Sequence, residues 1–184
     1  MSVLTAMWLP QQWPGAEQAE VQISPGRIWM QGMALAAHGN MPYRTEYAIT
    51  CGPDWQVRSF ALSCRLMGSS ARLTGRRDAE GRWYGEDGQE LPALAGCTEI
   101  DIRITPLTNT LPIRRLGLAE GESAEVGVVY IRVPELTMEP MRQRYTNLGG
   151  GRYRYENLAS GFAADIAVDG QGLVVDYPTA FTRI

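Results

Sequence analysis

Lysine is absent from this chain of 184 residues, and histidine and cysteine are scarce. All 17 basic residues are therefore arginines, which hold carboxylates and phosphates bidentately as lysine does not. A GC-rich coding sequence would produce the same bias. The net charge is −3 and no basic run exceeds two residues, so we expect no nucleic-acid partner. The single histidine, His38, is too little for a metal site or a Ser–His–Asp triad.

Long apolar runs are missing as well. No stretch approaches the ~20 apolar residues of a transmembrane helix, so no transmembrane segment is expected. Residues 1–10 lack the basic start and the unbroken apolar run of a signal peptide. Cys51, Cys64 and Cys97 are odd in number and have no C-x-x-C spacing, which favours reduced thiols and a cytoplasmic location. The glycines at 149–151 do not open a helix, and no cofactor is expected.

Short segments of alternating apolar and polar residues are abundant, and they are typical of strands with one buried face. Turn signals recur about every 8 to 12 residues, the spacing of a β-barrel or sandwich. We predict a single all-β domain, 1–184, with about ten to thirteen strands. These would form a curled antiparallel sheet, barrel-like and either open or closed, with few short helices. The predicted strands are 18–24, 27–35, 43–51, 55–66, 71–76, 82–84, 97–105, 124–133, 137–148, 152–155, 162–168 and 173–177, with 8–20 otherwise loop-like and 91–95 a helical turn or covering loop.

The 97–118 segment is the one around which the rest of the chain is expected to be organised. Ile100, Ile102 and Ile104 alternate with polar residues, which predicts a central strand with one buried face. Pro106 and Pro112 interrupt the remainder of the segment, so an irregular, hydroxyl-rich stretch is expected there. The polar residues on the opposite face are Glu99, Asp101, Arg103 and Thr105, and two arginines, Arg114 and Arg115, close the segment.

Three short matches recur in the same order in the two halves of the chain. They pair 19–21 with 124–126, 42–47 with 140–145, and 78–81 with 169–172. Each match alone is of chance quality. Their shared order suggests two duplicated half-barrels, about 15–95 and 121–184, with Arg44 and Arg142 related by a pseudo-two-fold axis.

Several motifs are specific enough to compare with known families. The longest is Thr-Pro-Leu-Thr-Asn-Thr-Leu-Pro-Ile-Arg-Arg-Leu-Gly-Leu at 105–118, and shorter ones lie at 55–58, 78–83, 142–145 and 172–178. Together with Cys97 and Asp101 they resemble the bacterial putative glycolipid-binding family over nearly the whole chain. The resemblance implies a barrel-like all-β fold, similar to carriers that move lipoproteins between bacterial membranes, and a ligand-binding role. It supplies no catalytic residues.

The candidate binding residues are polar or aromatic side chains on the predicted strands. Arginines directed into a barrel would clamp a phosphate, carboxylate or sugar head group, whereas on the outer face they would only be solvated. Asp101 would need an arginine partner if it lay inside. The aromatic residues of the strands would stack on sugars or line an acyl-chain cavity, unless they only fill the core. They are Trp13, Trp29, Trp55, Trp83, Tyr47, Tyr145, Tyr153, Tyr155 and Tyr177. The candidates are Arg44, Arg58, Asp101, Asn109, Arg114, Arg115, Arg142, Arg144 and Tyr145.

Three functions are consistent with this sequence. The first is a non-enzymatic binding protein for an amphipathic ligand, such as a glycolipid or a fatty-acyl compound. The second is a small enzyme for an anionic or sugar substrate, with Asp101 as base. The third is a fully packed β module that only mediates interactions. The first is favoured, and a homodimer is left open.

Overall fold

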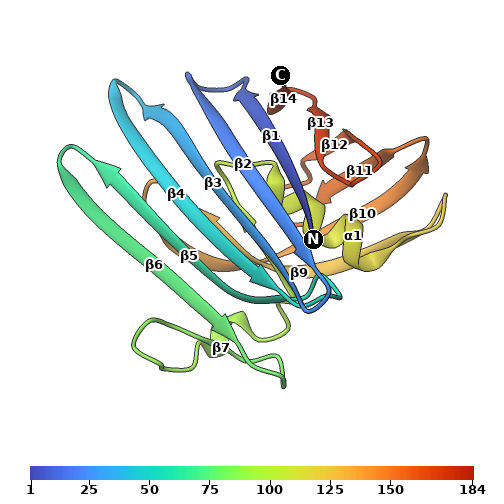
Figure 1. Ribbon diagram of the computed structural model, residues 1–184, viewed down its shortest axis with the longest axis horizontal. Coiled ribbons are helices and arrows are strands. Elements are labelled where there is room, and N and C mark those ends of the chain that lie inside the picture. Colours follow the sequence, from blue (N-terminus) through green and yellow to red (C-terminus); the bar gives the residue numbers. More distant parts are fainter.

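The computed structural model describes residues 1–184 except for the side chain of His38. Fourteen strands form one sheet in the order β7-β6-β5-β4-β3-β2-β1-β14-β13-β12-β11-β10-β9-β8. The sheet curls strongly and its two edges, β7 and β8, do not pair with each other (Figure 1). The predicted all-β, open barrel-like fold is therefore confirmed. The strands are β1 (Ser2–Pro10), β2 (Gly15–Ser24), β3 (Arg27–His38), β4 (Met41–Cys51), β5 (Val57–Leu66), β6 (Ser69–Arg77), β7 (Trp83–Tyr84), β8 (Glu99–Ile102), β9 (Ser123–Arg132), β10 (Thr137–Gly149), β11 (Arg152–Asn157), β12 (Ala163–Val168), β13 (Val174–Tyr177) and β14 (Phe181–Arg183).

Alternation places one face of each long strand inside the curl. In β4, Tyr43, Tyr47 and Ile49 are buried, whereas Arg44 and Glu46 between them are exposed. The same two-residue pattern continues in register across neighbouring strands, so the inner face is one continuous surface.

Two strands were missed because they lie where the sequence reads as loop. Residues 2–7 of β1 fell in no predicted strand and residues 8–10 fell in the segment taken as loop-like, and β14 is only three residues long. The two strands pair with each other and close the middle of the sheet.

The 97–118 segment lies inside the curl instead of forming a central strand (Figure 1). β8 is an edge strand, and it pairs with β9 in parallel, unlike the other paired strands. Both of its faces are buried, since Glu99 is as inaccessible as Ile100, so the predicted single buried face is wrong.

The stretch after β8 is helical where an irregular chain was expected. A 3₁₀ turn, Leu107–Asn109, leads into helix α1, Thr110–Leu116, which Gly117 ends in a left-handed conformation. Pro112 falls in the first turn of α1, where a helix needs no backbone N–H donor and tolerates proline. The expected helical turn near 91–95 is present as the 3₁₀ turn Pro92–Leu94.

Candidate functional site

Two adjoining cavities open at the end of the sheet where β1, β3 and β5 stop. We call this end the mouth; the turns 11–14, 39–40 and 67–68 border it, and they lie along the upper left of Figure 1. The cavities have volumes of about 290 and 260 Å³. They share Gln12, Trp13 and Arg103, so we treat them as one site with two compartments.

The second compartment is walled by aromatic rings. Trp13 meets Phe181 edge to face at 5.6 Å between ring centroids, and Tyr177 follows at 6.4 Å from Phe181. Tyr155 lies 6.0 Å from Tyr177, and Phe162 lies 6.2 Å from Tyr155. These rings come from β11, β13, β14 and the loops that precede β2 and β12, so the wall is built by several neighbouring strands of the curled sheet. Phe162 and Trp13 are only partly covered and present apolar surface to the cavity.

A chain of hydrogen bonds forms the polar floor of this compartment. The Tyr145 hydroxyl donates to Asn109 Oδ1 at 2.8 Å, and Gln143 Nε2 donates to Asp101 Oδ2 at 2.5 Å. The Thr108 hydroxyl donates to the other oxygen of Asp101 at 3.3 Å. Burial raises the pKa of Asp101 against these two hydrogen bonds, which lower it. Asp101 thus lies inside, but an amide and a hydroxyl take the place of the arginine partner that we expected.

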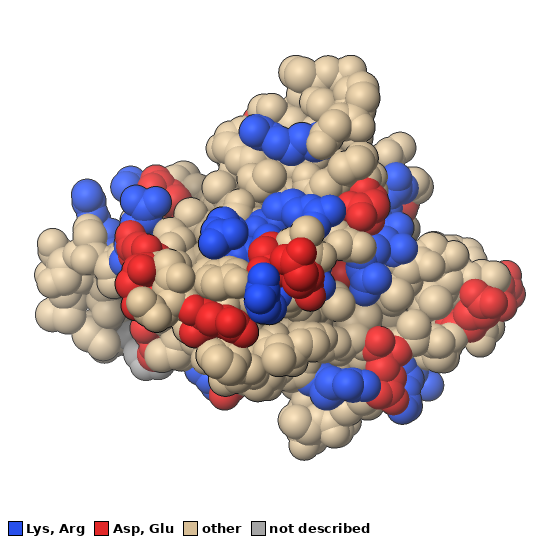
Figure 2. Space-filling model, turned by 90° about the horizontal axis from the view of Figure 1, so that it is seen from below, with Lys and Arg blue, Asp and Glu red and all other residues tan. Residues whose placement is uncertain are grey.

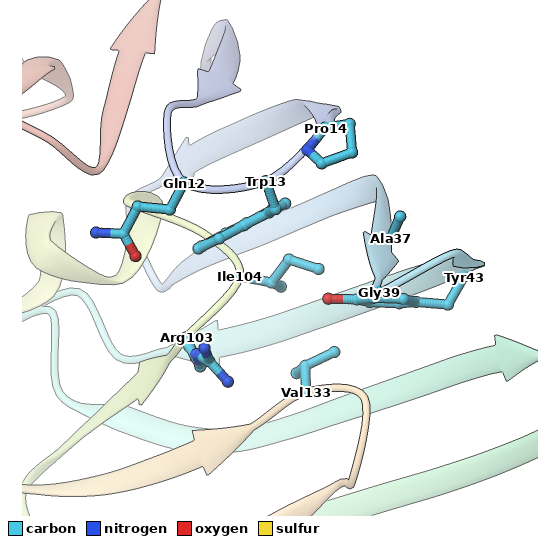
Figure 3. Close-up of a pocket in the computed structure, with 9 residues that line it drawn as sticks. All are labelled: Gln12, Trp13, Pro14, Ala37, Gly39, Tyr43, Arg103, Ile104 and Val133. Carbon is cyan, nitrogen blue, oxygen red and sulfur yellow. The ribbon is translucent and has the colours of Figure 1, made fainter.

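Arg103 is the cation at the boundary between the two compartments. Among the described side chains it has no ion-pair partner. Figure 3 shows Trp13 above Ile104, Arg103 below them, and the Tyr43 hydroxyl directed into the space between. Burial raises the pKa of Tyr43, although the nearby charge of Arg103 acts in the opposite direction. An exposed guanidinium beside a tryptophan ring suits an anionic or polyhydroxylated group.

A second polar cluster lies deeper, between the sheet and the 97–118 segment. The Tyr47 hydroxyl donates to Glu17 Oε1 and lies 3.2 Å from the Thr105 hydroxyl. Gly32 makes room for it, because a Cβ there would lie 2.3 Å from the Tyr47 hydroxyl. Burial raises the pKa of Glu17 from 4.5 to about 8, and the hydrogen bonds of Thr105 and Tyr47 only partly offset this. Glu17 is therefore largely protonated at neutral pH.

Three of the candidate arginines lie on the outer face, which corrects the expectation that they line a cavity. Arg44 sits 3.4 Å from Glu46 on β4. Arg142 and Arg144 on β10 share Glu125, at 2.8 and 2.7 Å. Each of these arginines lies next to a buried residue in its strand, so strand alternation directs the arginine to the outer face. Carboxylates on that face pair with them. Figure 2 shows such arginines and carboxylates interspersed on one face of the molecule.

The other three candidate arginines occupy separate places. Arg58 lies 4.0 Å from Asp54 at the start of β5. Arg114 stacks over Trp55 at 5.1 Å from the ring centroid. Arg115 bonds to the fully buried Glu99. Both Arg114 and Arg115 lie on helix α1 and not on a strand.

Of the nine candidates, Asp101, Asn109 and Tyr145 come together at the site, and the arginines named with them do not. Sequence reasoning named Arg103, Trp13, Tyr155 and Tyr177 only within larger groups of arginines and aromatic residues. It missed Gln12, Tyr130, Asn157, Phe162 and Phe181. No signal in the sequence marks these residues, because the curl of the sheet alone brings them together.

Two other classes of feature are not found over the described part of the chain. No cluster of three or more His, Cys, Asp or Glu side chains is arranged to hold a metal ion. None of the described helices has both the length and the apolar character needed to cross a bilayer.

Comparisons with known proteins agree with this architecture. No curated protein matches the chain. The crystal structure of a DUF1089 family protein from Pseudomonas aeruginosa superimposes with a TM-score of 0.82 and 39% sequence identity, covering 91% of this chain and 92% of that one. The model of the family described as "Putative glycolipid-binding" matches residues 5–183. The chain therefore belongs to the putative glycolipid-binding family.

Proposed function

We propose that this protein binds an amphipathic, sugar-bearing lipid at the mouth without transforming it. The observation that carries the proposal is the second compartment, where an aromatic wall faces Asp101, Arg103 and Asn109. Aromatic faces stack on the apolar side of sugars and on acyl chains, whereas carboxylate and amide groups bond to hydroxyls. The family description points to the same class of ligand.

The size of the site narrows the proposal. Pockets for small molecules usually measure about 300–1,000 Å³. Compartments of about 290 and 260 Å³ suit a head group and the first part of an acyl chain, but not a whole lipid. We propose that the head group lies between Arg103 and Asp101, and that the chain leaves past Trp13 and Phe162.

Octyl β-D-glucoside, kept below its critical micelle concentration, tests this proposal. Trp13 lies in the site, so binding should change tryptophan fluorescence, and calorimetry gives the affinity. Trp13→Ala and Phe162→Ala should each weaken binding about tenfold, because each removes one face of the apolar wall. Arg103→Gln should weaken binding of an anionic alkyl glucuronide more than that of the neutral glucoside.

Arg142→Gln is the matched control, since it removes the same charge from the outer face. Its affinity should equal that of the wild type. Native mass spectrometry after gentle purification, followed by organic extraction, would identify a natural ligand. The proposal fails if no alkyl glycoside binds and no lipid copurifies, or if Trp13→Ala and Arg142→Gln behave alike.

We also propose a cytoplasmic location, supported by three cysteines that are all free and buried. Thiol titration in denaturant of protein taken directly from cells should find three reduced thiols. Disulfide-linked material would contradict this location.

A further inference from the structure

An exposed apolar and cationic surface lies on the outer side of β3–β6, next to the mouth. We call it the methionine–arginine face, and it consists of Met33, Leu35, Arg44, Arg65, Met67 and Arg72. The exposed fractions of Met67, Leu35 and Met33 are 78%, 52% and 39%. Large apolar side chains that remain in water cost stability and solubility unless something covers them.

Strand register holds these residues side by side. Leu35 pairs with Arg44, which pairs with Arg65 on the next strand. One row further along, Met33 pairs with Glu46, and Arg72 closes that row on β6. A shallow depression of about 580 Å³ floored by small residues lies beside Met33 and Arg72. The face is thus fixed by the sheet and does not depend on mobile loops.

The charge on this face is not balanced as it is elsewhere on the outer surface. Arg44 and Arg65 are direct cross-strand partners, an arrangement that like charges make unfavourable. Among the described side chains of these two rows, Glu46 is the one carboxylate for three arginines. By contrast, Arg142 and Arg144 on β10 converge on Glu125. The face is locally positive on a chain whose net charge is −3.

Met67 is unusual in both its exposure and its backbone. Leu66 pairs with Ser69, so Met67 and Gly68 form a two-residue hairpin turn. Both have positive φ, +49° and +80°, as a type I′ turn requires. Asparagine, aspartate or glycine suits the first position, and methionine is strained there. Neither folding nor solubility explains a strained and exposed apolar side chain at the tip of a hairpin. Its presence therefore points to a contact between Met67 and a partner.

We propose that the methionine–arginine face docks on the surface of an anionic lipid bilayer. Peripheral membrane binding has two components: apolar side chains enter the membrane–water interface, and arginines neutralise lipid phosphates. The turns after β3 and β5 lie at the same end of the sheet as the turn that carries Trp13 (Figure 1). Docking therefore brings the mouth close to the membrane, whatever ligand the mouth takes.

Sedimentation with vesicles tests the proposal. Wild-type protein should bind 1:1 phosphatidylglycerol–phosphatidylcholine vesicles at low salt, and removing the anionic lipid or adding salt should weaken binding at least tenfold. Arg65→Gln and Arg72→Gln should each weaken it about fivefold, the equivalent of about 1 kcal/mol per charge near an anionic surface. Met67→Asn should weaken it several-fold while keeping or raising the melting temperature, because asparagine suits the turn.

Two control variants match these changes in chemistry but not in position. Leu148→Asn removes an exposed apolar side chain at the far end of β10, and Arg142→Gln removes a charge that Glu125 already neutralises. Both should sediment like the wild type. The proposal is overturned if wild-type binding ignores phosphatidylglycerol, or if the face variants match the controls.

A second copy of the chain is the other occupant that the test can reveal. Analytical ultracentrifugation should find the same oligomeric state for wild type and Met67→Asn; a dimer that the substitution dissolves would assign the face to self-association instead. Octyl glucoside affinity should be unchanged in the face variants. The docking proposal can therefore fail while the proposed function stands, and the proposed function can fail while the docking proposal stands.

Discussion

Arg115→Met is expected to destabilise the fold by about 3 kcal/mol at pH 8. The Arg115 guanidinium donates to Glu99, which is 0% exposed, and the second oxygen of Glu99 has no hydrogen-bond partner. Without Arg115 the carboxylate would be a buried charge with no ion-pair partner, because Arg77 lies near enough to lower its pKa but forms no ion pair with it. Glu99→Gln/Arg115→Met should recover most of the loss, because no charge then remains to be buried. Urea unfolding monitored by circular dichroism measures all three proteins.

The loss should depend on pH with a definite sign. Burial raises the pKa of Glu99 from 4.5 to about 7, although Arg115 lowers it. Removing Arg115 raises the pKa further, so at pH 5 folded Glu99 is protonated and the variant should lose much less stability than at pH 8. Arg144→Met, which breaks an exposed pair with Glu125, should change stability little at either pH. An equal loss at both pH values, or no recovery in the double variant, would refute a charge-based role for this pair.

Glu17→Gln should make the protein more resistant to alkaline pH. The folded-state pKa of about 8 lies above the ordinary value of 4.5. Between these values the unfolded chain releases the Glu17 proton while the folded chain keeps it, so wild-type stability is complete below pH 4.5 and falls as pH rises to 8. A difference of 8 − 4.5 at 1.36 kcal/mol per pH unit amounts to about 5 kcal/mol. Glutamine does not ionise and escapes this loss.

Thermal unfolding of both proteins from pH 4.5 to 8.5 measures the effect. The melting temperature of Glu17→Gln relative to wild type should rise by roughly 10 °C across this range. Glu20→Gln, on the same strand but outside the buried cluster, is the charge-matched control, and its pH profile should follow that of the wild type. Parallel pH profiles for wild type and Glu17→Gln would mean that Glu17 is not held neutral by burial.

The alternation of apolar and polar residues predicted most strands, because it shows which residues share a face of the sheet. In β4 this pattern depends only on the local sequence. It failed for β8, where Glu99 and Ile100 are both buried, because burial there depends on packing against distant segments. Helix α1 spans only seven residues, which are too few to show a helical period in the sequence. Pro112 within it was interpreted as a break in regular structure. The duplicated halves and the single-domain organisation stay predictions.

The site was less predictable than the fold for a related reason. Asp101, Asn109 and Tyr145 were identified as candidates within the most distinctive motifs, and they do meet. Phe162 and Phe181 lie on short segments with no motif; the long-range pairing of β14 with β1 brings Phe181 to Trp13, and the curled sheet places Phe162 on the same cavity. Arginine content suggested a cationic interior, yet carboxylates such as Glu125 hold several arginines on the outside. Arg103 is the arginine that lines both compartments of the mouth.

The pairing of β1 with β14 has a consequence for how the chain assembles. Every other antiparallel neighbour in the sheet is also the next strand in sequence, so those ladders close over short loops. The β1–β14 ladder has only three register pairs, the first of which is Trp8 with Arg183. Nearly the whole chain lies between the paired residues. Loop-closure entropy makes such a contact slow to form. In kinetic terms the protein consists of two local meanders joined by one long-range pairing, that of β1 with β14. The rows of residues that build the mouth are completed only when this pairing forms.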